Sequence, residues 1–370
     1  MRVGIVSSRL AAILGVEAPI VLGPFGGLSS VALTSRVSEL GGLGSYGLYG
    51  YGGVRIRQVV EQLRGATGRP FALNVWLETG DEAGTGDFDI AEGGSALESL
   101  FAEVGLEPPA DVPERFLPDA SEQIDAVIQA RPRVVSFVYG VPAPEVVEAA
   151  HRVGAAVLGT ATTVDEAVAL AEGQVDAVVA SGAEAAGHRV SFLRSPEDSL
   201  VGTFALIPQV VDAVDVPVIA AGGIADRRGV AAAFALGAEG VQVGTAFLVT
   251  RQSAAVASYR AAVRSAAAHD TVLTRAMSGR LARGLPNLAT RTIEDGGTIA
   301  PFPAQNWLTG QFRGPAALAG RADLLSLWAG QAAALAHFDE ARGVFAELAE
   351  GLPSGAGIDD SGGGRMRSPG

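Results

Sequence analysis

Residues 217–247 read PVIAAGGIADRRGVAAAFALGAEGVQVGTAF, and this segment carries the clearest indication of the fold. Its two ends, PVIAA (217–221) and GVQV (240–243), are short strand-like runs, and the segment RGVAAAFALG between them has apolar residues at helical spacing. Two strands joined by a helix pair in parallel, because an antiparallel pair needs only a short turn. The stretch therefore predicts one strand–helix–strand unit of a parallel sheet.

Six further strands of the same kind precede this unit. They are predicted at residues 19–23, 43–46, 71–75, 134–138, 155–159 and 176–180. Ala-rich segments with an apolar stripe at helical spacing lie between them. Eight such repeats are typical of a closed barrel, so we expect an α/β fold, a (β/α)8 TIM barrel over residues 10–265. An open doubly wound sheet is the alternative, since a periodicity count can miss or invent a strand.

The remaining segments depart from this rhythm. Residues 78–120 are rich in Gly, Pro and acidic residues, and we expect an insertion there after the third strand. Residues 266–350 show helical patterns without strand patterns and predict a C-terminal helical satellite domain. Residues 351–370 are dense in Gly and Ser, which predicts a disordered tail.

The composition narrows the class of protein. Of 370 residues, 48% are hydrophobic and 18% charged, which predicts a globular protein with a large core. The net charge of −13 argues against nucleic acid and anionic membranes as partners. We expect a cytoplasmic protein, because no apolar run reaches the roughly 18 residues needed to span a bilayer. The sequence contains neither cysteine nor lysine, which excludes thiolate nucleophiles, cysteine-bound zinc, lysine Schiff bases and the P-loop.

Glycine-bearing turns follow the last two predicted strands. Gly222 and Gly223 come after residue 221, and the final strand runs through Gln242 and Val243 into Gly244 and Thr245. In a barrel, the loops after strands seven and eight commonly bind phosphate through backbone N–H groups. We therefore predict a site for a phosphorylated ligand, the alternative being that these glycines only turn the chain.

His188 is the histidine at the predicted catalytic end of the barrel. It follows the sixth strand in the small-residue segment SGAEAAGHR (181–189), which leaves room for a ligand. Glu184 and His188 have the spacing of two metal ligands on a helix, but no nearby second histidine completes a site, so we predict no metal. GLGSYG (42–47) fits a dinucleotide pattern but lies after a helix, which argues against that interpretation.

Taken together, several segments resemble the nitronate monooxygenase family, formerly called 2-nitropropane dioxygenases. They are PIVLGPFGGLSS, FALNVWL, SGAEAAGHRV, the stretch from 217 to 247, PAQNWLTG and SLWAGQ. The resemblance covers roughly residues 10–335 apart from the acidic insertion. It implies an FMN-dependent TIM-barrel enzyme.

The resemblance also implies roles for residues of this sequence. His188 matches the catalytic histidine of the family. The implied cofactor-binding residues are Pro24, Phe25, Gly26, Asn74, Ser181, Ala186, Gly187, Gly222, Gly223, Gln242, Val243, Gly244 and Thr245. The family usually reads Q-G-x-E-A-G-G-H, so Ser181 replaces a glutamine and Ala186 a glycine. The methyl group of Ala186 would narrow the approach or forbid a positive φ at that position.

The activity implied is the oxidation of alkyl nitronates or nitroalkanes by O2 to carbonyl compounds and nitrite. FMN would supply the electron chemistry, and His188 would remove the α-proton of a neutral nitroalkane. Two alternatives remain open: a flavin-dependent enoyl-thioester reductase of the same superfamily, and a specialised biosynthetic flavoprotein with another substrate. The expected partners are small molecules, and a homo-oligomer is left open.

Overall fold

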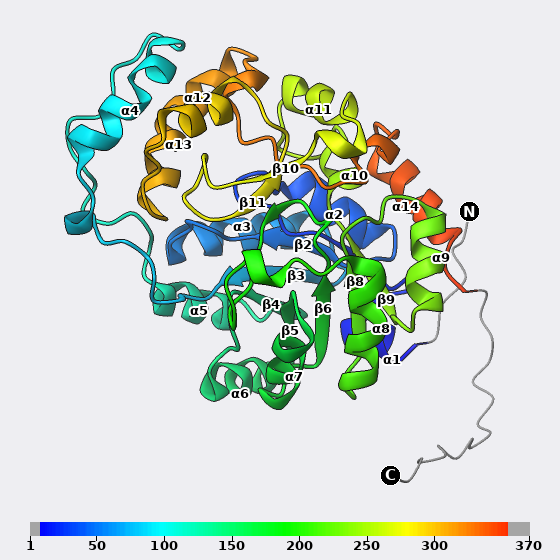
Figure 1. Cartoon of the computed structure of the whole chain (residues 1–370). Coiled ribbons are helices and arrows are strands. Elements are labelled where there is room, and N and C mark those ends of the chain that lie inside the picture. Colours follow the sequence, from blue (N-terminus) through cyan, green and yellow to red (C-terminus); the bar gives the residue numbers. More distant parts are fainter. Residues whose placement is uncertain (1–7, 354–370) are drawn as a thin grey trace, which may run out of the picture.

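A barrel of eight parallel strands forms the centre of the protein, whose computed structural model describes residues 8–353 (Figure 1). The barrel strands are β1 (Ile20–Leu22), β2 (Gly44–Gly47), β3 (Phe71–Trp76), β4 (Val134–Val138), β5 (Ala156–Ala161), β6 (Ala177–Ser181), β8 (Val218–Ala221) and β9 (Gly240–Val243). They pair in the order β1, β9, β8, β6, β5, β4, β3, β2, and a parallel bridge between Val21 and Leu43 joins β1 to the start of β2. The predicted TIM barrel is confirmed, and the closing bridge excludes the open sheet.

A ring of helices covers the outside of the barrel. Its members are α2 (Val31–Glu39), α3 (Gly53–Ala66), α5 (Ala120–Gln129), α6 (Pro144–Arg152), α7 (Val164–Glu172), α8 (Thr203–Ala213), α9 (Arg227–Ala235) and α14 (Ala341–Ala349). The strand β9 is followed only by the short helix α10 (Thr245–Leu248). Helix α14 packs against both α2 and α9 and so fills the place in the ring next to β9, far along the chain from it.

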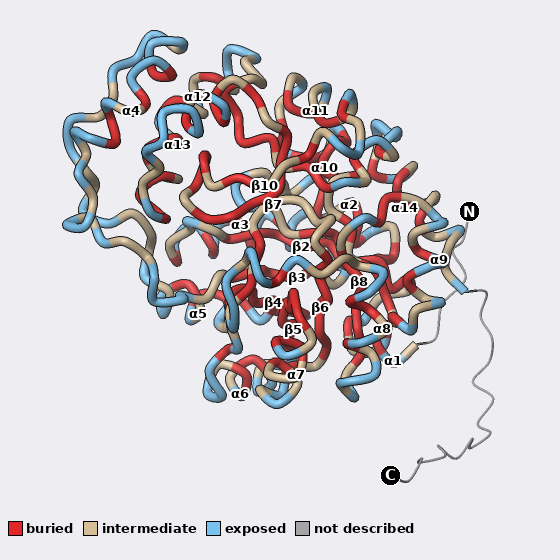
Figure 2. The backbone as a smooth tube through the Cα atoms, viewed as in Figure 1, coloured by how far each residue is buried: buried red, intermediate tan, exposed pale blue. Residues whose placement is uncertain are grey.

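Nearly every residue of the barrel strands is buried (Figure 2), so the side chains on both faces of these strands belong to the core. Such strands read as continuous apolar runs, which is why the sequence pattern located them well. Helix α1 (Arg9–Leu14) closes the N-terminal end of the barrel: Leu10 and Leu14 are fully buried and belong to the same cluster as Val21 and Leu43.

Gly44 and Gly47 of GLGSYG are the first and last residues of β2 and pack closely against their surroundings. A Cβ atom on Gly44 would lie 2.0 Å from the carbonyl oxygen of Thr34 in α2, and one on Gly47 would lie 2.8 Å from the carbonyl oxygen of Phe25. These glycines therefore let α2 and the loop after β1 approach the sheet, which accounts for the motif without a dinucleotide.

Residues beyond the barrel form a cap over one end. The insertion after β3 contributes α4 (Ile90–Ala102), which packs against α12 (Leu288–Gly296) and α13 (Ala304–Leu318) of the C-terminal segment, beside α11 (Ala257–Arg264) (Figure 1). Short 3-10 turns lie at Thr85–Asp87, Glu197–Ser199, Ala268–Asp270, Ala322–Leu324 and Ala333–Leu335. Most of the predicted tail, from residue 354 on, lies outside the described residues.

The segment predicted to be purely helical also contains strands. β10 (Val272–Thr274) and β11 (Ala282–Gly284) form an antiparallel sheet with β7 (Gly187–His188), which comes from the loop after β6. In this sheet Ala282 pairs with His188 and Arg283 pairs with Gly187. Strands of two or three residues are too short to show an alternating pattern, so this sheet could not be predicted from the sequence.

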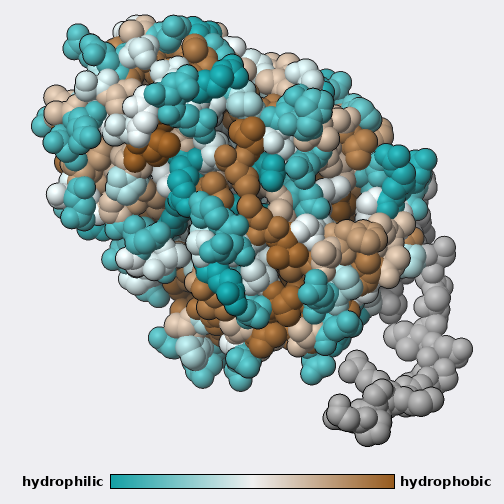
Figure 3. Space-filling model, in the orientation of Figure 1, coloured by the Kyte–Doolittle hydropathy of each residue, from teal (hydrophilic) through white to brown (hydrophobic). Residues whose placement is uncertain are grey.

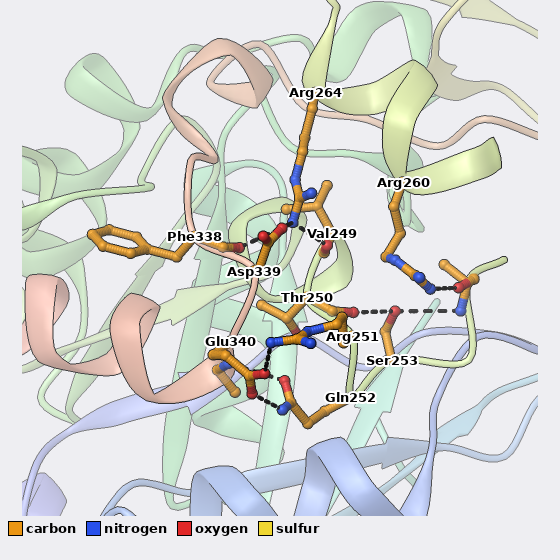
Figure 4. Close-up of polar contacts among 12 residues, drawn as sticks. Val249, Thr250, Arg251, Gln252, Ser253, Arg260, Arg264, Phe338, Asp339 and Glu340 are labelled. Atoms are coloured by element: carbon orange, nitrogen blue, oxygen red, sulfur yellow. Dashed lines mark hydrogen bonds and ion pairs between the residues drawn. The ribbon is translucent and has the colours of Figure 1, made fainter. Parts of the chain in front are cut away.

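A polar network joins the loop after α10 to the chain that enters α14 (Figure 4). The side chains of Arg251 and Gln252 both donate to the Glu340 carboxylate, and the Arg251 amide donates to the Asp339 carbonyl (2.9 Å). Arg264 of α11 donates to the carbonyls of Val249 (2.8 Å) and Phe338 (3.2 Å). These contacts fix the position of α14 in the ring.

Hydrophilic side chains cover most of the face seen in Figure 3, and hydrophobic ones gather in a band across its centre. Of the helices in the described part of the chain, none has both the length and the apolar character that crossing a bilayer requires.

Candidate active site

A cavity of about 400 Å³ lies at the carboxyl ends of the barrel strands. This is the end at which barrel enzymes of this fold carry their active sites. The predicted site residues that line it are Pro24, Phe25, Gly26, Asn74, Ser181, Ala186, Gly187, His188, Gly222, Gly223, Gln242, Gly244 and Thr245. Val243 does not line it: its side chain is fully buried in the core, and its carbonyl accepts a bond from the amide of Gly23 (2.9 Å).

The turns after β8 and β9 present backbone to this cavity. Gly222 and Gly223 have φ angles of 98° and 70°, which L-residues rarely adopt. A Cβ atom on Gly222 would lie only 3.1 Å from the carbonyl oxygen of Gly182 and 3.2 Å from the amide of Ala185. Within residues 8–353 the amides of Gly223, Gly244 and Thr245 have no hydrogen-bond acceptor. Adjacent free amides on tight glycine turns fit a bound phosphate group.

Asn74 reaches the cavity from the middle of the barrel. It is buried in β3, and its Nδ2 donates to the hydroxyl of Ser136 on β4 (3.0 Å). This bond fixes the amide plane, so the orientation of its polar atoms is set before a ligand enters.

His188 is held between two indole rings. The ring of Trp76 lies 5.1 Å away in an edge-on arrangement, and the ring of Trp328 lies at 5.4 Å. The His188 Nε2 is 2.8 Å from the Ser278 hydroxyl. Burial, together with the positive charges of Arg280 and Arg313, lowers the pKa of His188 to about 3. The imidazole is therefore neutral at physiological pH.

The two departures from the family pattern fit locally. The positive φ falls on Gly187, at 75°, whereas Ala186 is not among the described residues with positive φ. The Ala186 methyl group therefore causes no backbone strain. Ser181 ends β6, and its carbonyl accepts a bond from the buried Arg189 (3.0 Å), which ties the segment to the barrel.

The Glu184 carboxylate lies at the start of helix α8. It accepts bonds from the amide (2.9 Å) and the hydroxyl (2.9 Å) of Thr203, the first residue of α8. A carboxylate is favourable at a helix N-terminus, where amides are otherwise unpaired. Glu184 thus caps the N-terminus of α8.

Sequence reasoning did not single out several residues that line the cavity. They are Tyr49, Trp76, Asn306, Arg313 and Trp328. The segments QNWLTG and SLWAGQ, which carry Asn306 and Trp328, were part of the resemblance and so held a signal for them. The cavity contact of Arg313 depends on how α13 packs over the barrel, which no local pattern indicates.

Comparison with known proteins identifies the family of this chain. The family model for nitronate monooxygenase matches residues 7–351. The chain belongs to the nitronate monooxygenase family. It is 35% identical over 348 residues to a probable nitronate monooxygenase of Staphylococcus haemolyticus, covering 93% of this chain and 96% of the relative. Membership of the nitronate monooxygenase family makes it an oxidoreductase.

Solved structures agree with this family assignment. The nitroalkane oxidase of Streptomyces ansochromogenes is 35% identical with a TM-score of 0.81, covering 93% of this chain and 99% of that one. FabK of Thermotoga maritima is 28% identical with a TM-score of 0.72, covering 93% and 95%. Each match covers 93% of this chain, so both structures correspond to its barrel and to most of its cap.

Proposed function

We propose that the protein is an FMN-dependent nitronate monooxygenase, which oxidises alkyl nitronates or nitroalkanes with O2 to carbonyl compounds and nitrite. The observation that carries the proposal is that one cavity combines free amides on the β8 and β9 turns with a buried neutral imidazole. The family membership supports the same conclusion.

The residues of the cavity fit FMN. The amides of Gly223, Gly244 and Thr245 would hold its phosphate, and the absence of Cβ atoms at Gly222 and Gly223 lets the backbone approach it. The cation that lines this cavity, Arg313, is already bonded to Asn306 and Ser326, so the phosphate would be held mainly by backbone dipoles. When bound, FMN supplies the electron transfer that no side chain here provides.

His188 would act as the base toward a neutral nitroalkane. The Ser278 hydroxyl lies 3.2 Å from the Arg280 carbonyl, to which it can donate. We therefore assign the shared proton of the His188–Ser278 bond to Nε2, which leaves Nδ1 free to accept a proton. After the α-proton has moved to Nδ1, Arg280 and Arg313 favour the nitronate anion that remains.

Anaerobic reduction tests the proposal. Ethylnitronate added to the FMN-loaded protein without O2 should bleach the flavin absorbance, and O2 should then restore it with release of nitrite. NADH and NADPH should leave the absorbance unchanged. Bleaching by a reduced nicotinamide and none by the nitronate would contradict the proposal and favour the enoyl-thioester reductase.

A further inference from the structure

A second cavity of about 470 Å³ lies beside the first. The insertion contributes one wall, through residues 82–85 and 114–120, and the C-terminal segment contributes Arg280, Phe302 and Pro303. Tyr49 and Trp76 line both cavities. The second, outer cavity is therefore separated from the inner one by these two side chains.

Trp76 forms the main part of this partition. It is the last residue of β3, and its ring contacts His188 on the inner side, with 5.1 Å between ring centres. On the other sides it packs on Tyr49 at 4.5 Å and is stacked on Phe302 at 6.1 Å. Phe302 also lines the outer cavity. A group attached to a substrate carbon beside His188 would thus meet the Trp76 ring before reaching the outer cavity.

The outer wall is held in a fixed position by Arg280. Its guanidinium lies 4.0 Å over the ring of Phe302 and donates to Thr79 (2.6 Å) and Glu82 (2.7 Å) as well as to Asp81. These contacts bind the first loop of the insertion to the C-terminal segment. The wall of the outer cavity is therefore held in place by defined side-chain contacts within the cap.

The side chains that line the outer cavity determine which kind of ligand it can hold. Its acidic residues outnumber its basic ones: Glu78, Glu82, Glu114 and Asp119 against Arg115 and Arg280. A carboxylate would be repelled there. Its aromatic members, Tyr49, Trp76, Phe116 and Phe302, suit an uncharged alkyl or aryl group.

We propose that the outer cavity is a subsite for the uncharged tail of longer nitronates, and that Trp76 is the partition that limits how far such a tail extends. This inference rests on the proposed function, because it places the reacting carbon beside His188. Trp76 then acts as a specificity-determining residue for chain length.

The test compares the nitronates of nitroethane and 1-nitrohexane. In Trp76→Leu, the ratio of kcat/KM for the long substrate to that for the short one should rise at least about tenfold over wild type. Adding Ala83→Phe, which fills the outer cavity, should bring the ratio back down. Phe101→Leu is the matched control, because that buried ring packs on Phe312 and lines neither cavity, so its loss should leave the ratio unchanged.

An equal effect of Trp76→Leu on both substrates would overturn the inference. If wild type oxidises neither nitronate, the proposed function fails, and calorimetric binding of 1-nitrohexane and nitroethane then decides the subsite separately. Selectively tighter binding of 1-nitrohexane to Trp76→Leu supports the subsite, whereas an equal change for both ligands contradicts it.

Discussion

His188 is fixed on several sides before any ligand binds. Trp76 and Trp328 confine its ring, and Ser278 engages Nε2 at 2.8 Å. A side chain held in one orientation loses little entropy when it reacts. The pKa of about 3 keeps the imidazole neutral across the physiological range but also makes it a weak base, so proton transfer requires the nitronate anion formed beside it to stabilise the imidazolium.

If His188 is the base, its loss should reduce the turnover of a neutral nitroalkane more than that of a nitronate. In His188→Asn, turnover of neutral nitroethane should fall by about 10² to 10⁴, because no other group replaces the base. Turnover of ethylnitronate should fall far less, since its α-proton is already gone. Steady-state oxygen consumption with each substrate measures the difference, with flavin content as the control for folding. Equal losses on both substrates would remove the base assignment.

Some residues of the site could be predicted from the sequence, and others could not. The position of His188 at the strand ends followed from the barrel pattern, and so did the glycines after β8. Val243 was placed at the site by the family resemblance, but its side chain points into the core because successive strand residues alternate in direction. Ser278 and Arg280 touch the site through long-range packing, which no spacing in the sequence encodes.

Among the elements, the turn after β8 is tightly constrained. Gly222 combines a φ of 98° with close contacts to Gly182, Ala185 and Thr203 at the place where a Cβ would lie. Its conformation brings the next amide to the cavity.

Gly222→Ala should therefore destabilise the protein by about 1–3 kcal/mol and weaken FMN binding at least about tenfold. Urea unfolding and flavin titration measure the two effects. Gly65→Ala in α3 is the control, because nothing lies within 4 Å of the added Cβ, and alanine favours a helix. If Gly222→Ala retained full FMN affinity, the turn would not be part of the cofactor site.

Elements differed in how well the sequence located them. Every barrel strand was predicted to within two residues, because each is a buried apolar run bounded by turn residues. The strands β7, β10 and β11 were missed, since two or three residues carry no period and their pairing joins segments far apart in the chain. The site depends on this small sheet, because it positions His188.

At the level of the whole molecule, the cap and the barrel are interlocked. Helix α14 completes the ring between α9 and α2, and α4 of the insertion packs on α12 and α13. The inner cavity thus lies between the ends of the barrel strands and the C-terminal segment, which contributes Asn306, Arg313 and Trp328. The sequence indicated these segments separately, but their closure over one cavity appears only in the fold.

If the turns after β8 and β9 bind the phosphate of FMN beside His188, a flavin without that phosphate should bind more weakly. Titration of the flavin-free protein with FMN and with riboflavin, which lacks the phosphate, measures this difference. Two or three charge-assisted hydrogen bonds from backbone amides predict that FMN binds at least about 100-fold more tightly than riboflavin. Equal affinity for the two flavins, or no binding of either, would contradict the account.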